Sequence, residues 1–113
     1  MRSDRPEFHI VLKSDCPTCR LVVPVLEQLA TNGVPVHAYF QDDADFLSGL
    51  TQTGSASVID DRTLEHSFRF EIDAVPTLLR FEDEVEVERT VGWSRADWEA
   101  LTGVPQLAVD LKE

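Results

Sequence analysis

The chain has 113 residues, of which 42% are hydrophobic, and this length suits one domain with a single modest core. We therefore expect residues 1–113 to form one domain. The 21 acidic residues outnumber the 10 basic ones, and the formal net charge is −11. Such a charge repels phosphate backbones and anionic membrane surfaces, which argues against nucleic-acid binding and membrane association.

The sequence also favours a reducing compartment. No apolar run approaches the ~20 residues that a bilayer span requires, and residues 1–6 lead into a short, acid-flanked segment unlike a signal peptide. We therefore expect a cytoplasmic protein. Two cysteines separated by two residues close too small a loop to act as a useful structural staple, so a structural disulfide is the weaker explanation for them.

Both cysteines lie in one motif, Cys16-Pro17-Thr18-Cys19, between an apolar run and a helical pattern. The N–H groups of a helix N-terminus favour the thiolate of Cys16, whereas the neighbouring Asp15 opposes it. A C-x-x-C pair alone indicates either redox chemistry or half of a zinc site. A zinc site needs two further ligands, and we expect no metal site here because the only histidines offer no matching set: His9, His37 and His66.

The first part of the chain predicts a strand, a helix and a second strand. The apolar run Phe8–Leu12 predicts a central strand buried on both faces, and two apolar rows predict a helix over residues 16–30 that ends at Asn32-Gly33. Pro24 lies inside this helix and removes one backbone hydrogen bond. Residues 34–40 predict a strand parallel to the first, because a helix connects the two.

The connection over residues 41–75 is the hardest to assign. Asp42-Asp43 predicts the start of a short helix that continues to Leu50. Residues 51–57 are small and polar and predict a loop.

A second helix is expected within this connection, over residues 61–70. Either Asp60 or Asp61 would cap it. We expect Leu64 and Phe68 to face inward, where they would cover the sheet.

The last part of the chain predicts a hairpin and a helix. Residues 77–81 and 85–91 flank a short acidic turn and predict two antiparallel strands. The second strand alternates valines with polar residues, so we expect an edge strand whose valines face the core. Ser94 predicts the N-cap of a helix that buries Trp98 and ends at Gly103.

These elements predict an α/β fold with a four-stranded mixed sheet, in which a β-α-β unit supplies two parallel strands and a hairpin supplies two antiparallel ones, flanked by helices. From Glu7 to Gly103 the chain resembles the thioredoxin and glutaredoxin families. Four features carry the resemblance: the C-P-T-C motif at a strand–helix junction, Pro24 eight residues after the first cysteine, the Val75-Pro76-Thr77 segment, and Gly92 before the last helix.

The resemblance implies a role for each matched residue. Cys16 would be the nucleophile that attacks a substrate disulfide, and Cys19 would resolve the mixed disulfide. Pro76 would follow a cis peptide bond beside Cys16, and the backbone of Val75 would pair with an extended substrate segment. The remaining positions implied to bind substrate are Pro17, Thr18, Gly92 and Trp93.

The sequence also departs from the thioredoxin pattern. Ile10 occupies the position at which thioredoxins bury an aspartate that assists the resolving thiol, so Asp15 and Asp73 become the candidates for that proton transfer. Lys13 precedes Cys16 by three residues, where glutaredoxins contact glutathione.

The resemblance implies a reductase of protein disulfides that uses a redox-active Cys16–Cys19 disulfide and no bound cofactor. Its partners would be disulfide-containing proteins and either a reductase or glutathione as electron donor. Two alternatives stay open: a glutathione-dependent, glutaredoxin-like reductase, and a non-catalytic domain that senses redox state or acts as an adaptor.

Overall fold

A computed structural model describes residues 6–50 and 56–107 of the chain. It contains a five-stranded sheet, three α-helices and one turn of 3-10 helix. Within the described ranges, no helix combines the length and apolarity needed to cross a bilayer. The elements follow the order β1 (Glu7–Leu12), α1 (Pro17–Thr31), β2 (Val36–Phe40), η1 (Asp45–Leu47), β3 (Ala56–Asp60), α2 (Glu65–Arg69), β4 (Thr77–Glu82), β5 (Val85–Val91) and α3 (Arg95–Thr102).

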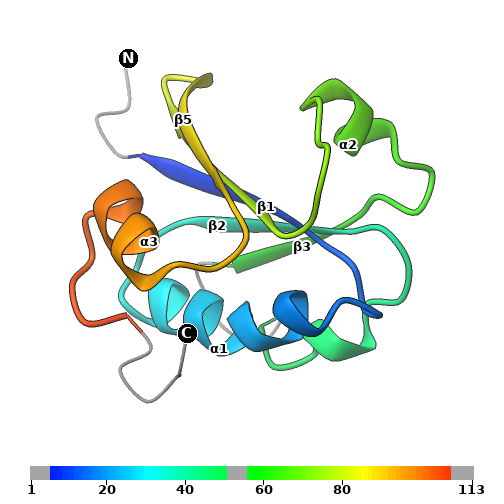
Figure 1. Ribbon diagram of the computed structural model, residues 1–113, viewed down its shortest axis with the longest axis horizontal. Helices are drawn as coiled ribbons and strands as arrows, with labels where there is room; N and C mark the ends of the chain where they lie inside the picture. The colour runs from blue at the N-terminus through cyan, green and yellow to red at the C-terminus, as the bar shows by residue number, and fades with distance from the viewer. Residues whose placement is uncertain (1–5, 51–55, 108–113) are drawn as a thin grey trace.

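The sheet has the strand order β3-β2-β1-β4-β5, with β1 at its centre (Figure 1). Strands β1, β2 and β3 are parallel, whereas β4 is antiparallel to β1 and β5 is antiparallel to β4. The α/β class, the β-α-β unit and the hairpin are therefore as predicted. β1 lies between two neighbours, and its apolar residues are fully buried, as a central strand requires.

The prediction of four strands is wrong, because β3 adds a fifth at the sheet edge. The predicted loop over 51–57 overlaps the start of this strand at residues 56–57, and its residues 51–55 lie outside the described ranges. The only local strand signal is the β-branched pair Val58-Ile59, which is half-buried. Such a short run is easily obscured by the polar residues on both sides.

The connection after β2 is also less helical than expected. The predicted helix from Asp42 to Leu50 is reduced to η1. Leu47 and Leu50 of this segment are nevertheless fully buried in the core.

The main core lies between the sheet and the pair α1 and α3, while α2 lies on the opposite side of the sheet (Figure 1). α1 contributes its two apolar rows, and the exposed Pro24 lies inside it. In α3, Ser94 Oγ accepts a hydrogen bond from the Asp97 N–H (3.4 Å), and Trp98 is fully buried, as predicted. The largest fully buried side chains are Trp98, Phe8, Ile10, Leu12, Leu26, Leu29, Leu47, Leu50, Leu78, Leu79, Leu101 and Leu107.

The opposite face carries a second cluster, made of aromatic rings. His9 stacks on His37 and Tyr39 and contacts Phe70 and Phe81, with ring centroids 4.4–5.8 Å apart. Burial, followed by the nearby charge of His37, lowers the pKa of His9 from 6.5 to about 4. The His9 imidazole is therefore neutral at pH 7.

The predicted orientation of the second helix is wrong. Leu64 is 48% exposed and Phe68 is 86% exposed. The helix spans only five residues, and its position is set by a polar anchor: the buried Asp61 carboxylate accepts hydrogen bonds from the backbone N–H groups of His66 (2.7 Å) and Ser67 (2.9 Å). The N-cap position is Leu64, so neither Asp60 nor Asp61 is the N-cap as predicted, although Asp61 binds N–H groups of the first turn from three positions earlier.

The predicted burial of the β5 valines is wrong as well, although β5 is an edge strand as expected. Val85, Val87 and Val91 are 51–61% exposed. The β4–β5 pairing shifts register between Arg80 and Phe81, so the alternation along β5 does not produce a buried face on this edge strand.

Candidate active site

The turn after β1 presents Cys16 at the start of α1. Cys16 is the N-cap residue with extended backbone (φ −98°, ψ 114°), and its sulfur accepts a hydrogen bond from the Cys19 N–H at 3.2 Å. Cys16 is half-exposed, and its sulfur lies 3.8 Å from the Val75 carbonyl oxygen. The Cys19 N–H in the first turn of α1 therefore points at the sulfur that solvent can reach.

Cys19 occupies the first turn of α1 and is completely buried. Its sulfur accepts a hydrogen bond from the Lys13 N–H at 3.4 Å. Burial, followed by the hydrogen bond with Cys16, raises the pKa of Cys19 from 9.0 to about 12, although the Lys13 N–H opposes this effect. Both cysteines are free thiols in this structure. The site therefore holds one accessible sulfur and one sheltered, protonated thiol.

The segment before β4 lies beside the first cysteine. The Val75–Pro76 peptide bond is cis, and Pro76 is buried. The Thr77 hydroxyl donates a hydrogen bond to the Ala74 carbonyl (2.6 Å), and the Gly92 N–H donates one to the Pro76 carbonyl (2.8 Å). Gly92 has φ +81°, a conformation that favours glycine, so a residue with a side chain would be strained at this position.

The two tryptophans pack against each other near Gly92. Their rings meet edge to face with centroids 5.1 Å apart, and Trp98 Nε1 donates a hydrogen bond to the Gly92 carbonyl at 3.0 Å. Trp93 is half-buried against the core, and its Nε1 has no partner among the described residues. A role for Trp93 beside substrate stays a prediction.

The charged candidates lie around the motif in different ways. Lys13 Nζ lies 3.7 Å from Asp15 Oδ2, and both side chains are largely exposed. Lys13 and Asp73 line the same small hollow of about 190 Å³ next to Val75, together with Gln41, Ile72 and Ala74. Ile10 is fully buried in the core, so the position directly beneath the motif carries no ionisable group. Pro17 is exposed and Thr18 is half-exposed on α1, consistent with access from solvent.

Asp42 is a structural part of the site that the sequence interpretation missed. Its carboxylate accepts hydrogen bonds from the Ser14 N–H (2.8 Å) and the Ser14 hydroxyl (2.7 Å), so it holds the turn that leads to Cys16. Burial alone would raise the pKa of Asp42, but the two Ser14 hydrogen bonds lower it below its usual value. A signal did exist, since the carboxyl ends of parallel strands β1 and β2 meet at one sheet edge.

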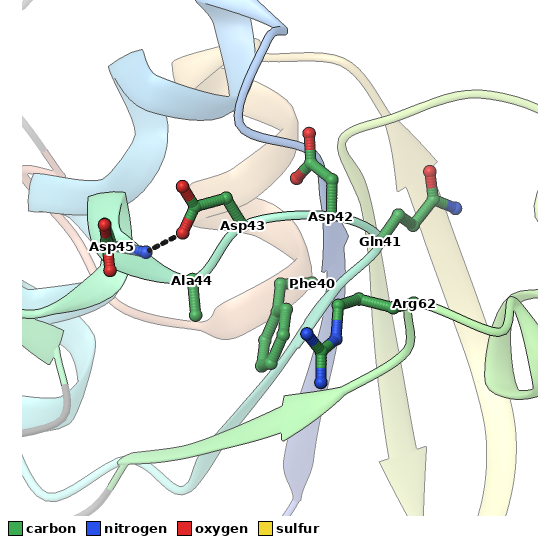
Figure 2. Close-up of a pocket in the computed structure, with 7 residues that line it drawn as sticks. All are labelled: Phe40, Gln41, Asp42, Asp43, Ala44, Asp45 and Arg62. Carbon is green, nitrogen blue, oxygen red and sulfur yellow. Dashed lines mark hydrogen bonds between the residues drawn. The ribbon is translucent and has the colours of Figure 1, made fainter.

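Figure 2 shows Asp42 on the segment after β2, where it is one of the residues that line an open pocket. This pocket has a volume of about 640 Å³ and lies between that segment and Arg62. Arg62 is paired with Asp60 (2.8 Å), and the Asp43 carboxylate accepts a hydrogen bond from the Asp45 N–H. Two of the charged side chains that line the pocket, Asp43 and Arg62, therefore already have local partners.

The chain was compared with known proteins. No family model and no curated protein matches it. Among solved structures, one described as a putative thiol:disulfide interchange protein DsbE, from Chlorobium tepidum, aligns with a TM-score of 0.71 at 21% identity. The alignment covers 88% of this chain and 77% of the other. DsbF of Mycobacterium tuberculosis aligns with a TM-score of 0.72 at 16% identity, covering 88% and 80%.

Thioredoxins also match in shape. Thioredoxin O2 of Arabidopsis thaliana aligns with a TM-score of 0.59 at 19% identity, covering 88% of this chain and 74% of the other. At such low identities these likenesses concern the fold. Together with the strand order and the Cys16–Cys19 pair at the start of α1, they establish that this chain has the thioredoxin fold.

Proposed function

We propose that this protein is a thiol–disulfide oxidoreductase that reduces disulfides in proteins through Cys16 and Cys19. The observation that carries the proposal is the unequal environment of the two sulfurs. Cys16 is accessible and accepts a helix N-terminal hydrogen bond, whereas Cys19 is buried with a pKa raised to about 12. Unequal sulfurs suit a reaction in which one attacks the substrate and the other releases it.

In the first step the Cys16 thiolate attacks one sulfur of the substrate disulfide. The Cys16–substrate bond forms, the substrate S–S bond breaks, and the second substrate sulfur leaves as a thiolate. The Val75 carbonyl, 3.8 Å from the Cys16 sulfur, is placed to pair with the backbone N–H of an extended substrate segment.

In the second step Cys19 loses its proton and attacks the Cys16 sulfur. The Cys16–Cys19 disulfide forms, and the remaining substrate sulfur leaves as a thiolate, so two electrons pass from the protein to the substrate. A dithiol reductant must then restore the two thiols. Because burial holds the proton on Cys19, this step needs a base, and Asp15 and Asp73 remain the proposed groups.

The proposed substrates are neutral or basic protein surfaces, since the net charge of −11 repels acidic ones. We also propose a reducing, cytoplasmic setting, in which a dithiol donor is available.

The test is reduction of a model protein disulfide by catalytic amounts of the protein, with dithiothreitol as the reductant. We expect turnover above that of dithiothreitol alone. Cys16→Ser should abolish it, because the attacking sulfur is lost. Cys19→Ser should trap a mixed disulfide that mass spectrometry detects.

Thr31→Ser, an exposed change at the far end of α1, is the control and should retain full turnover. Retained activity in Cys16→Ser would refute the proposal.

Glutathione is a second possible electron donor, and the position of Lys13 supports it. Lys13 lines the small hollow beside Val75, where its charge can meet a carboxylate of a bound tripeptide. Replacing dithiothreitol with glutathione and glutathione reductase tests this route. Lys13→Ala should raise the KM for glutathione, and an unchanged KM would exclude this role.

A redox-sensing domain is the third candidate, supported by the apolar Ile10 beneath the motif. A sensor would show a disulfide potential near that of its compartment, with turnover no better than that of a small dithiol. Measurement of the potential against glutathione, together with the turnover assay, separates it from a reductase.

A further inference from the structure

All three histidines of the chain gather on the α2 face of the sheet, around Tyr39. The redox motif does not use them. His9 lies on β1, and His37 is its direct neighbour in the β1–β2 register. His66 lies on α2, with its ring centroid 5.0 Å from that of Tyr39.

A carboxylate joins two of these histidines. Glu7 and His9 are two residues apart on β1, so their side chains leave the strand on the same face. Glu7, His9 and His37 each offer a ligand atom, and these atoms lie within 4.8 Å of one another. We propose that Glu7, His9 and His37 bind one divalent transition-metal ion of the zinc type, with water completing the coordination.

The donor set fits this class of ion. Two imidazoles and one carboxylate with an open fourth position form a common zinc arrangement, in which bond lengths of 2.0–2.2 Å place ligand atoms about 3.3 Å apart. The His37 Nε2 and Glu7 Oε1 atoms are already 3.4 Å apart. Small side-chain rotations bring the third ligand atom to the same spacing. Harder ions such as Mg²⁺ and Ca²⁺ prefer sites built from oxygen atoms alone.

The surrounding residues orient the ligands. His9 Nδ1 lies 2.8 Å from the Tyr39 hydroxyl, and in the tautomer with a proton on Nδ1 this N–H donates to the Tyr39 oxygen. That tautomer leaves the Nε2 lone pair for a metal ion. A hydrogen bond from the second ring nitrogen is the usual support for a metal-bound histidine.

The site is accessible and separate from the cysteines. Among its ligands, the side chain of His37 is 26% exposed and that of Glu7 is 46% exposed, so an ion can enter from solvent. Glu7 opens β1, whereas the redox turn follows Leu12 at the other end of the strand, roughly 17 Å farther along.

The test uses the Cys16→Ser/Cys19→Ser double variant, because free thiols also bind zinc. Titration of this variant with Zn²⁺, against a chromophoric chelator, should show one saturable site per chain. In the same background His37→Gln should abolish saturable binding, Glu7→Gln should weaken it, and Tyr39→Phe should weaken it about tenfold or more. His9 is left intact because it packs among four rings.

His66→Gln is the matched control, since it removes a histidine of the same cluster that is not a proposed ligand. Its affinity for Zn²⁺ should equal that of the double variant. As a second readout, ¹⁵N signals of the His9 and His37 rings should shift on Zn²⁺ addition, while those of His66 stay in place. Absence of a saturable site, or an equal loss in His66→Gln and His37→Gln, would overturn the proposal. Because the tested protein lacks both cysteines, neither outcome depends on the redox function.

Discussion

At the scale of single residues, burial separates the chemistry of two thiols that lie one helical turn apart. The Cys16 sulfur reaches solvent, whereas Cys19 is fully enclosed and its neutral form is favoured. Charging a buried group costs the solvation energy of its ion, so the fold itself suppresses ionisation of Cys19. The same sequence of four residues therefore yields two sulfurs of different reactivity.

This difference predicts a pH dependence of stability. The pKa of Cys19 is raised from 9.0 to about 12 on folding, so the folded state holds the thiol proton more tightly than the unfolded state. Its stabilising contribution is complete below pH 9 and is lost as the pH rises from about 9 to about 12. Chemical denaturation of the reduced protein across this range should show the decline, and Cys19→Ala should show a smaller one.

At the scale of elements, the turn between β1 and α1 depends on a segment outside both of them. Asp42, just after β2, binds the backbone and hydroxyl of Ser14. Asp61, just after β3, holds α2 through the His66 and Ser67 N–H groups. Strands β2 and β3 are thus each followed by a carboxylate, of which one holds the turn before Cys16 and the other holds α2.

Asp42→Asn should lower the free energy of unfolding by about 1–2 kcal/mol, because a charged acceptor of two hydrogen bonds becomes a neutral amide. Turnover should fall as well, since the turn positions Cys16. Urea denaturation and the disulfide-reduction assay measure the two effects. Asp45→Asn removes the same charge from an exposed position three residues away and should leave both nearly unchanged. Equal effects of the two variants would contradict the role of Asp42 in holding the turn before Cys16.

At the scale of the whole molecule, the sequence predicted the elements well and their surroundings less well. The apolar rows of α1 and the central strand were recognisable, because one face or both faces meet the core. The valines of β5 follow the same alternation, yet they are more than half exposed on an edge strand whose register with β4 shifts. The prediction that Phe68 faces inward was wrong for a related reason: hydrogen bonds to the Asp61 carboxylate set the position of the short helix α2. Local patterns do not reveal which face a distant element will cover.

The same limit applied to the candidate site. The proposed cysteine roles rest on the resemblance that the C-P-T-C motif carries, and the structure places Val75 and Pro76 beside Cys16 as that resemblance implied. The contact between Asp42 and Ser14 joins residues 28 positions apart and has no local signature. The neighbouring positions of His9 and His37 likewise depend on strand register.

The edge strand β5, with its exposed valines, affects how readily the protein aggregates. It combines exposed valines with an outer backbone edge, a combination that templates strand-to-strand aggregation, and the interspersed Glu86 and Glu88 keep copies apart by charge repulsion. Raising the ionic strength to about 1 M screens this repulsion and should start oligomerisation, measured by light scattering. Val87→Lys changes a position that is 51% exposed and should keep the protein monomeric under the same conditions. Scattering equal to that of the unmodified chain would show that copies associate through a surface other than β5. The acidity of this chain then acts as protection against its own sheet edge.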